Sequence, residues 1–185
     1  AALGAAVNIT GNLKIDVPPP PANGAALAAM EAAIGRRPVV AAASTHAGEE
    51  AIMIETHRQL RGQHPGLLTI LAPRHPDRGA EITALAEAAG LATRRRSRGE
   101  MPDAECDIYI VDAVGELGVL YRVAPIVFMG GSLVAHGGQN PIEAAKLGAA
   151  ILHGPDVWNF AEIYAALDSS NGAREVADAA ALTAR

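Results

Sequence analysis

The sequence has few of the residues that define several large classes of protein. Only one of its 185 residues is a cysteine, and 3% are aromatic. Cys106 alone cannot form an internal disulfide, and no spacing of cysteine and histidine matches a metal site. We therefore expect no metal, no cofactor and a reducing compartment. Because aromatic side chains are scarce, the core must be built from alanine, valine, leucine and isoleucine.

Long apolar runs and an excess of positive charge are also missing. No run reaches the ~18–20 residues that cross a bilayer, and there is no signal peptide. The net charge of −5 argues against general nucleic-acid binding, so we expect no nucleic-acid partner. The chain begins at Ala1 without a methionine. This start favours a fragment of a longer protein, with any membrane anchor or partner domain cut away.

What the sequence does contain is a regular alternation of apolar runs and amphipathic segments. We expect strands at 7–10, 39–43, 67–71, 91–93, 107–111, 126–129 and 149–152. Helices are expected at 25–34, 49–61 and 77–89, and again from Glu116, Pro141 and Phe160. Unbroken apolar strands are typical of a parallel sheet that helices cover on both faces. The pattern predicts an α/β fold, a Rossmann-like three-layer sandwich with a parallel β-sheet, as one domain over residues 1–185.

Two glycine-rich stretches, at 115–118 and 130–143, each follow an expected strand and lead into an expected helix. Glycines let backbone N–H groups approach an anion, and a helix start adds about half a positive charge. Two such loops on consecutive strands predict a crevice that holds a nucleotide. The polar loops at 44–48, 74–76, 112–116 and 132–140 should all emerge at the carboxyl edge of the sheet.

Several residues of these loops have both a functional and a simpler interpretation. Glu143 is either a ribose clamp or a first-turn charge that favours the helix dipole, with Asn140 as the cap. Arg74 is either a bidentate phosphate donor, with His75 beside it, or a solvated arginine in an exposed turn. A nucleophile formed by Ser44 and His46 is disfavoured, because no G-x-S-x-G elbow is present.

Two further charged features carry simple interpretations. Glu49 and Glu50 open an expected helix and are most simply charges that favour its dipole. The basic run at 94–98 is most simply a solvated surface, and the alternative is a face for an anionic head group or substrate. No G-x-G-x-x-G follows a strand, so a dehydrogenase is not indicated.

Eight short motifs occur in an order that resembles one known family. They are GNLK at 11–14, STH at 44–46 with GEE at 48–50, PRHP at 73–76, RRS at 95–97 with GE at 99–100, GELG at 115–118, GGSL at 130–133, NP at 140–141 with Glu143, and NF at 159–160. Together they resemble the C-terminal half of the 3-deoxy-D-manno-octulosonic acid (Kdo) transferases of lipopolysaccharide assembly. The resemblance spans nearly the whole chain.

The resemblance implies the donor-binding half of a GT-B glycosyltransferase. Its donor is CMP-Kdo and its acceptor is a lipid A precursor. The acceptor site and the catalytic carboxylate base belong to the N-terminal half, so no catalytic residue is expected here and the fragment alone should be inactive. The full-length protein would act at the cytoplasmic face of the inner membrane, and the fragment itself would be soluble. No metal is required if Arg74 and a helix N-terminus neutralise the leaving phosphate.

By resemblance, ten residues are expected to contact CMP-Kdo. They are Ser44, Thr45, Pro73, Arg74, His75, Gly115, Glu116, Leu117, Asn140 and Glu143. The group at 73–75 is assigned to the phosphate or cytosine, the group at 115–117 to the phosphate, and the last two residues to the ribose. Two departures stand out: Gln139 replaces an expected histidine, and Ala113 with Val114 replaces a Thr-Met or Thr-Leu pair.

Two other interpretations remain open from the sequence alone. One is a GT-B enzyme or nucleotide-sugar epimerase with a different nucleotide. The other is a nucleotide-binding or interaction module without catalytic activity. The sequence does not indicate the number of Kdo residues transferred, the acceptor variant or the oligomeric state.

Overall fold

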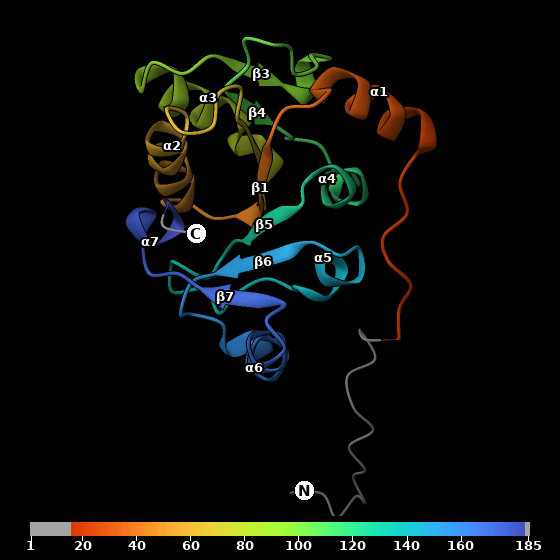
Figure 1. Ribbon diagram of the computed structural model, residues 1–185, viewed down its shortest axis with the longest axis vertical. Helices are drawn as coiled ribbons and strands as arrows, with labels where there is room; N and C mark the ends of the chain where they lie inside the picture. The colour runs from red at the N-terminus through yellow and green to blue at the C-terminus, as the bar shows by residue number, and fades with distance from the viewer. Residues whose placement is uncertain (1–15, 184–185) are drawn as a thin grey trace, which may run out of the picture.

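A seven-stranded parallel sheet forms the centre of the computed structural model, which describes residues 16–183 (Figure 1). The strands are β1 (Val39–Thr45), β2 (Leu68–Pro73), β3 (Thr93–Arg95), β4 (Ile108–Ile110), β5 (Ile126–Met129), β6 (Ala150–His153) and β7 (Ala173–Glu175). Their order in the sheet is β3-β4-β2-β1-β5-β6-β7, and every neighbouring pair is parallel. The predicted parallel α/β sheet is confirmed.

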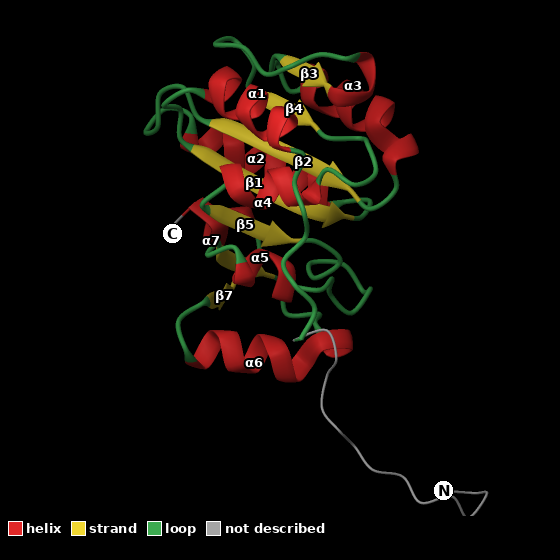
Figure 2. Ribbon diagram, turned by 90° about the vertical axis from the view of Figure 1, so that its right-hand side faces the viewer, coloured by secondary structure: helices red, strands yellow, loops and turns green. Residues whose placement is uncertain are grey.

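Helices cover both faces of this sheet: Figure 1 shows helices on either side of the strands, and Figure 2 looks onto one of the covered faces. They are α1 (Gly24–Ile34), α2 (Glu49–Leu60), α3 (Gly79–Ala88), α4 (Leu117–Val123), α5 (Ile142–Lys146), α6 (Ala161–Ser169) and α7 (Ala179–Thr183). Helices α1, α4, α5 and α6 pack on one face, and α2, α3 and α7 on the other. The predicted three-layer sandwich is therefore confirmed.

Alternation of side chains along the strands divides the core between the two faces. In β5, Val127 and Met129 join the cluster under α1 and α4, whereas Phe128 joins the cluster under α2 and α3. The alanines of β1 alternate in the same way, and three of them are fully buried. Because both faces are covered, the central strands have no polar side and appear as unbroken apolar runs in the sequence.

The structure corrects several expected boundaries. The strand expected at 91–93 lies at Thr93–Arg95, and the helix expected at 77–89 is a 3-10 turn, Pro76–Arg78, followed by α3. Strand β7 and helix α7 were not expected, because β7 is a three-residue edge strand with a single buried residue and lacks an apolar run. The expected strand at 7–10 and the GNLK motif at 11–14 lie outside the described residues.

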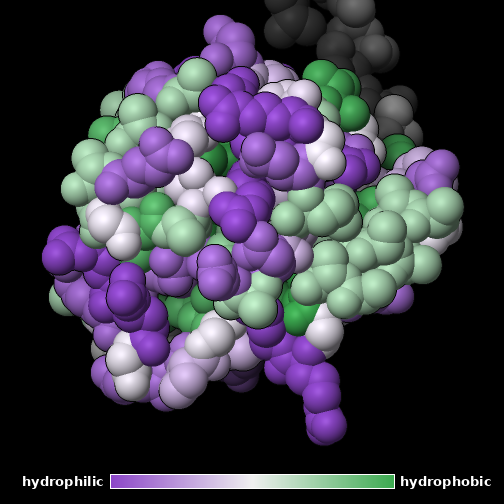
Figure 3. All heavy atoms as spheres, turned by 90° about the horizontal axis from the view of Figure 1, so that it is seen from above, coloured by the Kyte–Doolittle hydropathy of each residue, from purple (hydrophilic) through white to green (hydrophobic). Residues whose placement is uncertain are grey.

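A stretch of four prolines, at 18–21, precedes α1 and crosses α4. Arg122 of α4 donates from Nη1 to the carbonyl oxygen of Pro20 at 2.9 Å. A side chain at Gly118 of α4 would clash with the carbonyl oxygen of Pro21, so the crossing requires glycine there. The outer side of α1 is lined with exposed alanines, and Figure 3 shows a weakly apolar surface on that side of the molecule.

None of the helices within residues 16–183 combines the length and apolar character needed to cross a membrane.

Candidate functional site

The four polar loops predicted to converge follow four neighbouring strands, β4, β2, β1 and β5 in that order. Because these strands are parallel, their carboxyl ends share one edge, which confirms the convergence. The chain runs from β1 to one side through β2 and returns to the other side through β5. The pair β1 and β5 is therefore the topological switch point, where α/β sheets usually bind ligands.

The two glycine stretches do not follow neighbouring strands, contrary to expectation. Strands β4 and β5, which precede the two glycine stretches, are consecutive in sequence but are separated in the sheet by β2 and β1. Three strand spacings put them about 14 Å apart. The two glycine stretches therefore flank a wide edge, and the loops after β1 and β2 lie between them.

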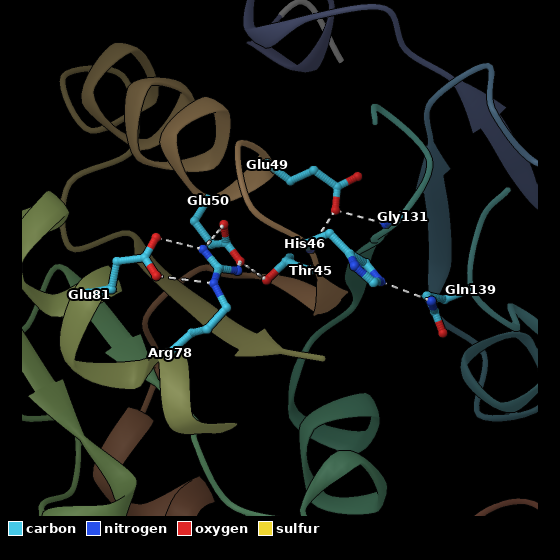
Figure 4. Close-up of polar contacts among 8 residues, drawn as sticks. All are labelled: Thr45, His46, Glu49, Glu50, Arg78, Glu81, Gly131 and Gln139. Atoms are coloured by element: carbon cyan, nitrogen blue, oxygen red, sulfur yellow. Dashed lines mark hydrogen bonds and ion pairs between the residues drawn. The ribbon is translucent and has the colours of Figure 1, made fainter. Parts of the chain in front are cut away.

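The second glycine stretch does not offer its first N–H groups to a ligand, because Glu49 already occupies them. The Glu49 carboxylate accepts hydrogen bonds from the backbone N–H groups of Gly131 at 2.7 Å, Ser132 at 3.0 Å and Leu133 at 3.0 Å. It also accepts one from the N–H of His46 at 2.8 Å. Glu49 is fully buried. The interpretation of Glu49 as a simple dipole charge is therefore wrong: it fastens the loop after β5 to the start of α2 (Figure 4).

Glu50 is also fully buried and joins three elements. It accepts a hydrogen bond from the Thr45 hydroxyl at 2.7 Å and pairs with Arg78 at 2.6 Å. Arg78 in turn pairs with Glu81 at 3.0 Å. Hydrogen bonds to Glu81 and Glu50 raise the pKa of Arg78, so the guanidinium stays charged. The simple dipole interpretation is wrong for Glu50 too, since the network fixes the loop after β2 against β1.

The turn after β2 leaves a guanidinium open to solvent. Pro73 is buried at the end of β2 and lies in register with Thr45 of β1. The next residue, Arg74, donates its backbone N–H to the carbonyl oxygen of Thr45 at 3.0 Å. The Arg74 side chain is exposed, and within residues 16–183 it forms no hydrogen bond or ion pair. This loop thus presents a positive charge held by a fixed backbone.

Three imidazole rings lie together above the switch point. The ring of His46 lies 3.8 Å from that of His136 and 6.1 Å from that of His75, measured between centroids. His46 Nε2 is 3.1 Å from the amide nitrogen of Gln139. A Cβ on Gly131 would lie 3.1 Å from His136 and 3.3 Å from His46, so the glycine makes room for the rings.

Strand β1 ends in an unusual backbone. Ser44 has a φ of 55°, in the left-handed region, which costs a residue other than glycine of order 1–3 kcal/mol. The register of β1 against β2 shifts between Ala43 and Thr45, so Ser44 bulges out of the ladder. The Ser44 side chain is partly exposed, whereas Thr45 is fully buried. Of the two, only Ser44 is open to a ligand at the switch point.

The first glycine stretch lies at the β4 end of the edge. Gly115 is exposed with a φ of 85°, and Leu117 begins α4 and packs partly against the core. Glu116 pairs with Arg96 at 3.0 Å, so its carboxylate is engaged with the loop after β3.

The basic run is less solvated than expected, because three of its arginines pair with carboxylates. These pairs are Arg94 with Asp103, Arg95 with Asp112 and Arg96 with Glu116. Burial disfavours the charged form of Asp112, but hydrogen bonds from Arg95 and Ser97 outweigh it and lower the pKa of that carboxyl. The run therefore ties β3 to the loop after β4.

Asn140 and Glu143 lie where the loop after β5 enters α5. The Asn140 side-chain oxygen accepts the N–H of Ile142 at 3.1 Å. The cap position of α5 is taken by Pro141, so Asn140 lies one residue before the cap that it was expected to form. Glu143 is partly exposed. Burial, followed by the negative charge of Glu143, raises the pKa of Tyr121.

The site residues that sequence reasoning missed are mostly framework groups. Glu49, Glu50 and Asp112 are buried carboxylates, and Arg78 and Arg95 are their partners. The only signal in the sequence was the position of two acids in the first turn of a helix beside the edge, and this position has a simpler explanation. Within the described residues, no cluster of three or more histidine, cysteine or acidic side chains has the arrangement of a metal site.

A cavity of about 470 Å³ lies at the opposite edge, away from all the predicted site residues. It is lined at the amino ends of β1, β5 and β6 by residues such as Val40, Ile126 and Ala150. Its lining is mainly apolar and carries none of the converging polar groups. The chemistry of the carboxyl edge makes that edge the better candidate.

Comparison with known proteins gives consistent matches. No protein-family model matches the chain. It is 37% identical over 174 residues to 3-deoxy-D-manno-octulosonic acid transferase of Haemophilus influenzae, covering 92% of this chain and 40% of that protein. It is 42% identical over 159 residues to the Bordetella pertussis transferase of the same name, covering 84% of this chain and 37% of that protein. The chain thus spans about two fifths of the length of these curated relatives.

Among solved structures, the chain is similar to the C-terminal CMP-Kdo binding domain of WaaA from Acinetobacter baumannii. The TM-score is 0.79 at 32% sequence identity, and the match covers 84% of this chain and 82% of that domain.

Proposed function

Since the chain belongs to the 3-deoxy-D-manno-octulosonic acid transferase family and matches its C-terminal domain, we propose that it binds CMP-Kdo at the carboxyl edge of its sheet. The observation that carries the proposal is the match over 82% of a domain described as binding CMP-Kdo. The open guanidinium of Arg74 beside the β1–β5 switch point supports the same location.

We further propose that the chain is one donor-binding domain of a two-domain GT-B glycosyltransferase. The whole enzyme transfers Kdo from CMP-Kdo to a lipid A precursor at the cytoplasmic face of the inner membrane. The acceptor site and the catalytic base then belong to residues outside this chain, and contact with the membrane is made by the full-length protein.

In this proposal, different polar groups of the carboxyl edge bind different parts of the nucleotide. Arg74, with Pro73 and His75, holds the phosphate, because a guanidinium forms charge-assisted bonds to phosphate oxygens. Asn140 and Glu143 hold the ribose, since a carboxylate accepts hydrogen bonds from two neighbouring hydroxyls. Ser44 lines the cleft on the β1 side, and the buried Thr45 supports it from below through its hydrogen bond to Glu50. Residues 115–117 border the phosphate from the β4 side.

The reaction of the whole enzyme is a direct displacement. A hydroxyl of the acceptor attacks the anomeric carbon of Kdo, its proton passes to the base, and the bond to the phosphate oxygen breaks so that CMP leaves. Arg74 is positioned to stabilise the charge that grows on the leaving phosphate. The buried carboxylates Glu49 and Glu50 act indirectly, by holding the loops after β1, β2 and β5 in place.

Calorimetric titration with CMP, cytidine and 2′-deoxy-CMP tests these roles. Arg74→Ala should weaken CMP by about 1.5–3 kcal/mol and cytidine much less, because only CMP carries the phosphate. Glu143→Ala should weaken CMP and cytidine to a similar degree and discriminate less against 2′-deoxy-CMP. Arg61→Ala, at an exposed arginine near the end of α2, and Glu162→Ala, at a first-turn acid of α6, are matched controls.

Three results would count against this assignment. An equal loss of affinity for CMP and cytidine in Arg74→Ala would show that Arg74 does not bind the phosphate. Unchanged affinities in Glu143→Ala would leave that residue as a helix-dipole charge. Stabilisation of the wild type by UDP or ADP but not CMP, measured by thermal shift, would point to a different nucleotide-sugar enzyme.

A further inference from the structure

The imidazole cluster is defined as His46, His75 and His136. Of its members, only His75 has a role in the nucleotide site described above, beside Arg74 at the phosphate. Its members come from three separate loops, after β1, β2 and β5. The ring of His46 is central, 3.8 Å from His136 and 6.1 Å from His75 between centroids. Three imidazoles brought together from distant parts of the chain form a built feature of the switch point.

Most of the ring nitrogens of this cluster have no protein partner. His46 Nε2 lies 3.1 Å from the Gln139 amide nitrogen, so the amide donates to an unprotonated Nε2 and leaves the proton on Nδ1 (Figure 4). Within residues 16–183, the rings of His75 and His136 have no hydrogen bond, and both residues are exposed. The cluster therefore presents several N–H donors toward the open edge.

Without a ligand, the surroundings of the central His46 ring favour its neutral form. Burial and then the neighbouring His136 lower the pKa of His46, and His75 acts in the same direction. Glu49 and Glu50 of α2 oppose this effect, but both carboxylates are turned to other partners. A negative group beside this ring would favour its protonated form and raise the pKa of His46, so binding of the group would be coupled to proton uptake.

We propose that the imidazole cluster is the subsite for the carboxylate of the donor sugar. This inference rests on the proposed function: a CMP-linked octulosonic acid carries two anions, the phosphodiester and the carboxylate on the anomeric carbon. Arg74 and His75 are consecutive, so a phosphate held by Arg74 lies next to the cluster. One anion then meets the guanidinium and the other meets the imidazoles.

Gln139 is the positioning residue of this subsite. Its side chain fixes the tautomer and the rotation of the His46 ring, and its backbone carbonyl accepts the Tyr164 hydroxyl at 2.8 Å. A glutamine does this without adding a titratable group. This role accounts for a residue that differs from the histidine expected at position 139.

Three ligands distinguish binding of the phosphate from binding of the carboxylate. They are CMP, the methyl ester of CMP and CMP-Kdo. The methyl ester is a phosphodiester like the donor but has no carboxylate, so its charge at the phosphate matches that of CMP-Kdo. His136→Phe keeps a ring stacked on His46 and removes both nitrogens. His64→Phe makes the same change at an exposed histidine at the opposite edge and serves as the control.

The expected result is a selective loss measured by calorimetry at pH 7. His136→Phe should weaken the binding of CMP-Kdo about tenfold, which is the effect of losing one charge-assisted hydrogen bond. It should change the affinity for the methyl ester less than about twofold. Wild-type protein should take up more protons with CMP-Kdo than with the methyl ester, as measured in buffers of different ionisation enthalpy. His136→Phe should reduce that difference, and His64→Phe should leave it intact.

Equal weakening of CMP-Kdo and the methyl ester in His136→Phe would overturn the proposal, as would no weakening of either. Equal proton uptake with the two ligands would also contradict it. Failure of the proposed function looks different, because wild-type protein would then bind neither CMP nor its methyl ester.

Discussion

Two neighbouring carboxylates, Glu49 and Glu50, organise the carboxyl edge at the residue scale. Both are fully buried, and both face groups from loops distant in sequence. A buried carboxylate is costly unless its lone pairs are satisfied. Here the hydrogen bonds between the Glu49 carboxylate and the loop N–H groups remove the cost of burying either one without a partner. The loop after β5 therefore depends on a side chain that is more than 80 positions earlier in the sequence.

Removing the Glu49 side chain tests this dependence. Glu49→Ala should destabilise the protein by about 3–5 kcal/mol, because it leaves the N–H groups of Gly131, Ser132 and Leu133 buried without an acceptor. Glu55→Ala removes an exposed acid of the same helix and should cost less than about 1 kcal/mol. Urea unfolding measures both values. Similar small losses of unfolding free energy for the two variants would show that the loop after β5 keeps its conformation without Glu49.

The buried histidine His57 makes stability depend on pH. Burial lowers the pKa of His57 despite the opposing charge of Asp107, and its Nδ1 is 2.9 Å from the Thr69 hydroxyl. The folded pKa is thus below the unfolded value of about 6.5. The contribution of His57 is fully present above that value and is lost as pH falls through it toward the folded pKa.

The predicted observable is a fall in the free energy of unfolding between about pH 7.5 and pH 5.5. The slope from one histidine is at most about 1.4 kcal/mol per pH unit. His57→Asn should flatten this fall while lowering stability at pH 7.5, and His64→Asn, at an exposed site, should follow the wild type. A His57→Asn curve parallel to the wild-type curve would contradict the assignment to His57.

At the scale of elements, the short helices depend on contacts with other parts of the chain for their position. Helix α4 has seven residues and α5 has five, too few to be stable alone in water. Helix α4 is fixed by its buried face and by the proline segment, whose Pro20 carbonyl accepts a hydrogen bond from Arg122. The position of residues 115–117 therefore depends on this crossing.

Adding one methyl group to α4 where the proline segment crosses it should displace that segment. Gly118→Ala would place Cβ against the Pro21 carbonyl, and we expect a loss of about 2–4 kcal/mol, as the backbone of the segment must move. Gly24→Ala, at the start of α1 with open space around it, should be neutral or stabilising by up to about 1 kcal/mol. Thermal unfolding compares the two. If Gly118→Ala is as stable as Gly24→Ala, the segment does not brace α4.

At the scale of the whole molecule, all seven strands belong to one sheet, and the proposed donor groups lie on a single edge of it. Such an edge binds a ligand from one side only. In the proposed GT-B enzyme, the second wall of the active site comes from another domain, and the exposed positions of Arg74 and His136 are those expected of groups that face it.

The chain on its own should therefore bind CMP weakly and transfer no sugar. Incubation with CMP-Kdo and a lipid A precursor, followed by mass spectrometry of the lipid, should show no added Kdo, because the base and the acceptor surface are expected in the other domain. A full-length relative serves as the positive control. Addition of Kdo to the lipid by this chain alone would overturn the two-domain proposal.

Much of the architecture is a local property of the sequence and could be predicted. Central strands such as β5 are buried on both faces, so each appears as an apolar run, and a glycine such as Gly90 marks where a helix stops. The edge strands β3 and β7 were displaced or missed, because an edge strand of three residues buries too little to require an apolar pattern. The family was also predictable, since its short motifs keep their order along the chain.

What only the tertiary structure decided is which of these local pieces meet. The sequence alone determined a parallel α/β sheet whose polar loops share one edge. It did not determine that β2 and β1 separate the two glycine stretches, that Glu49 occupies the loop after β5, or that His46, His75 and His136 come together. Each of these depends on the order of strands in the sheet. That order is chosen by packing over the whole chain, because residues distant in sequence become neighbours only when the strands between them are placed.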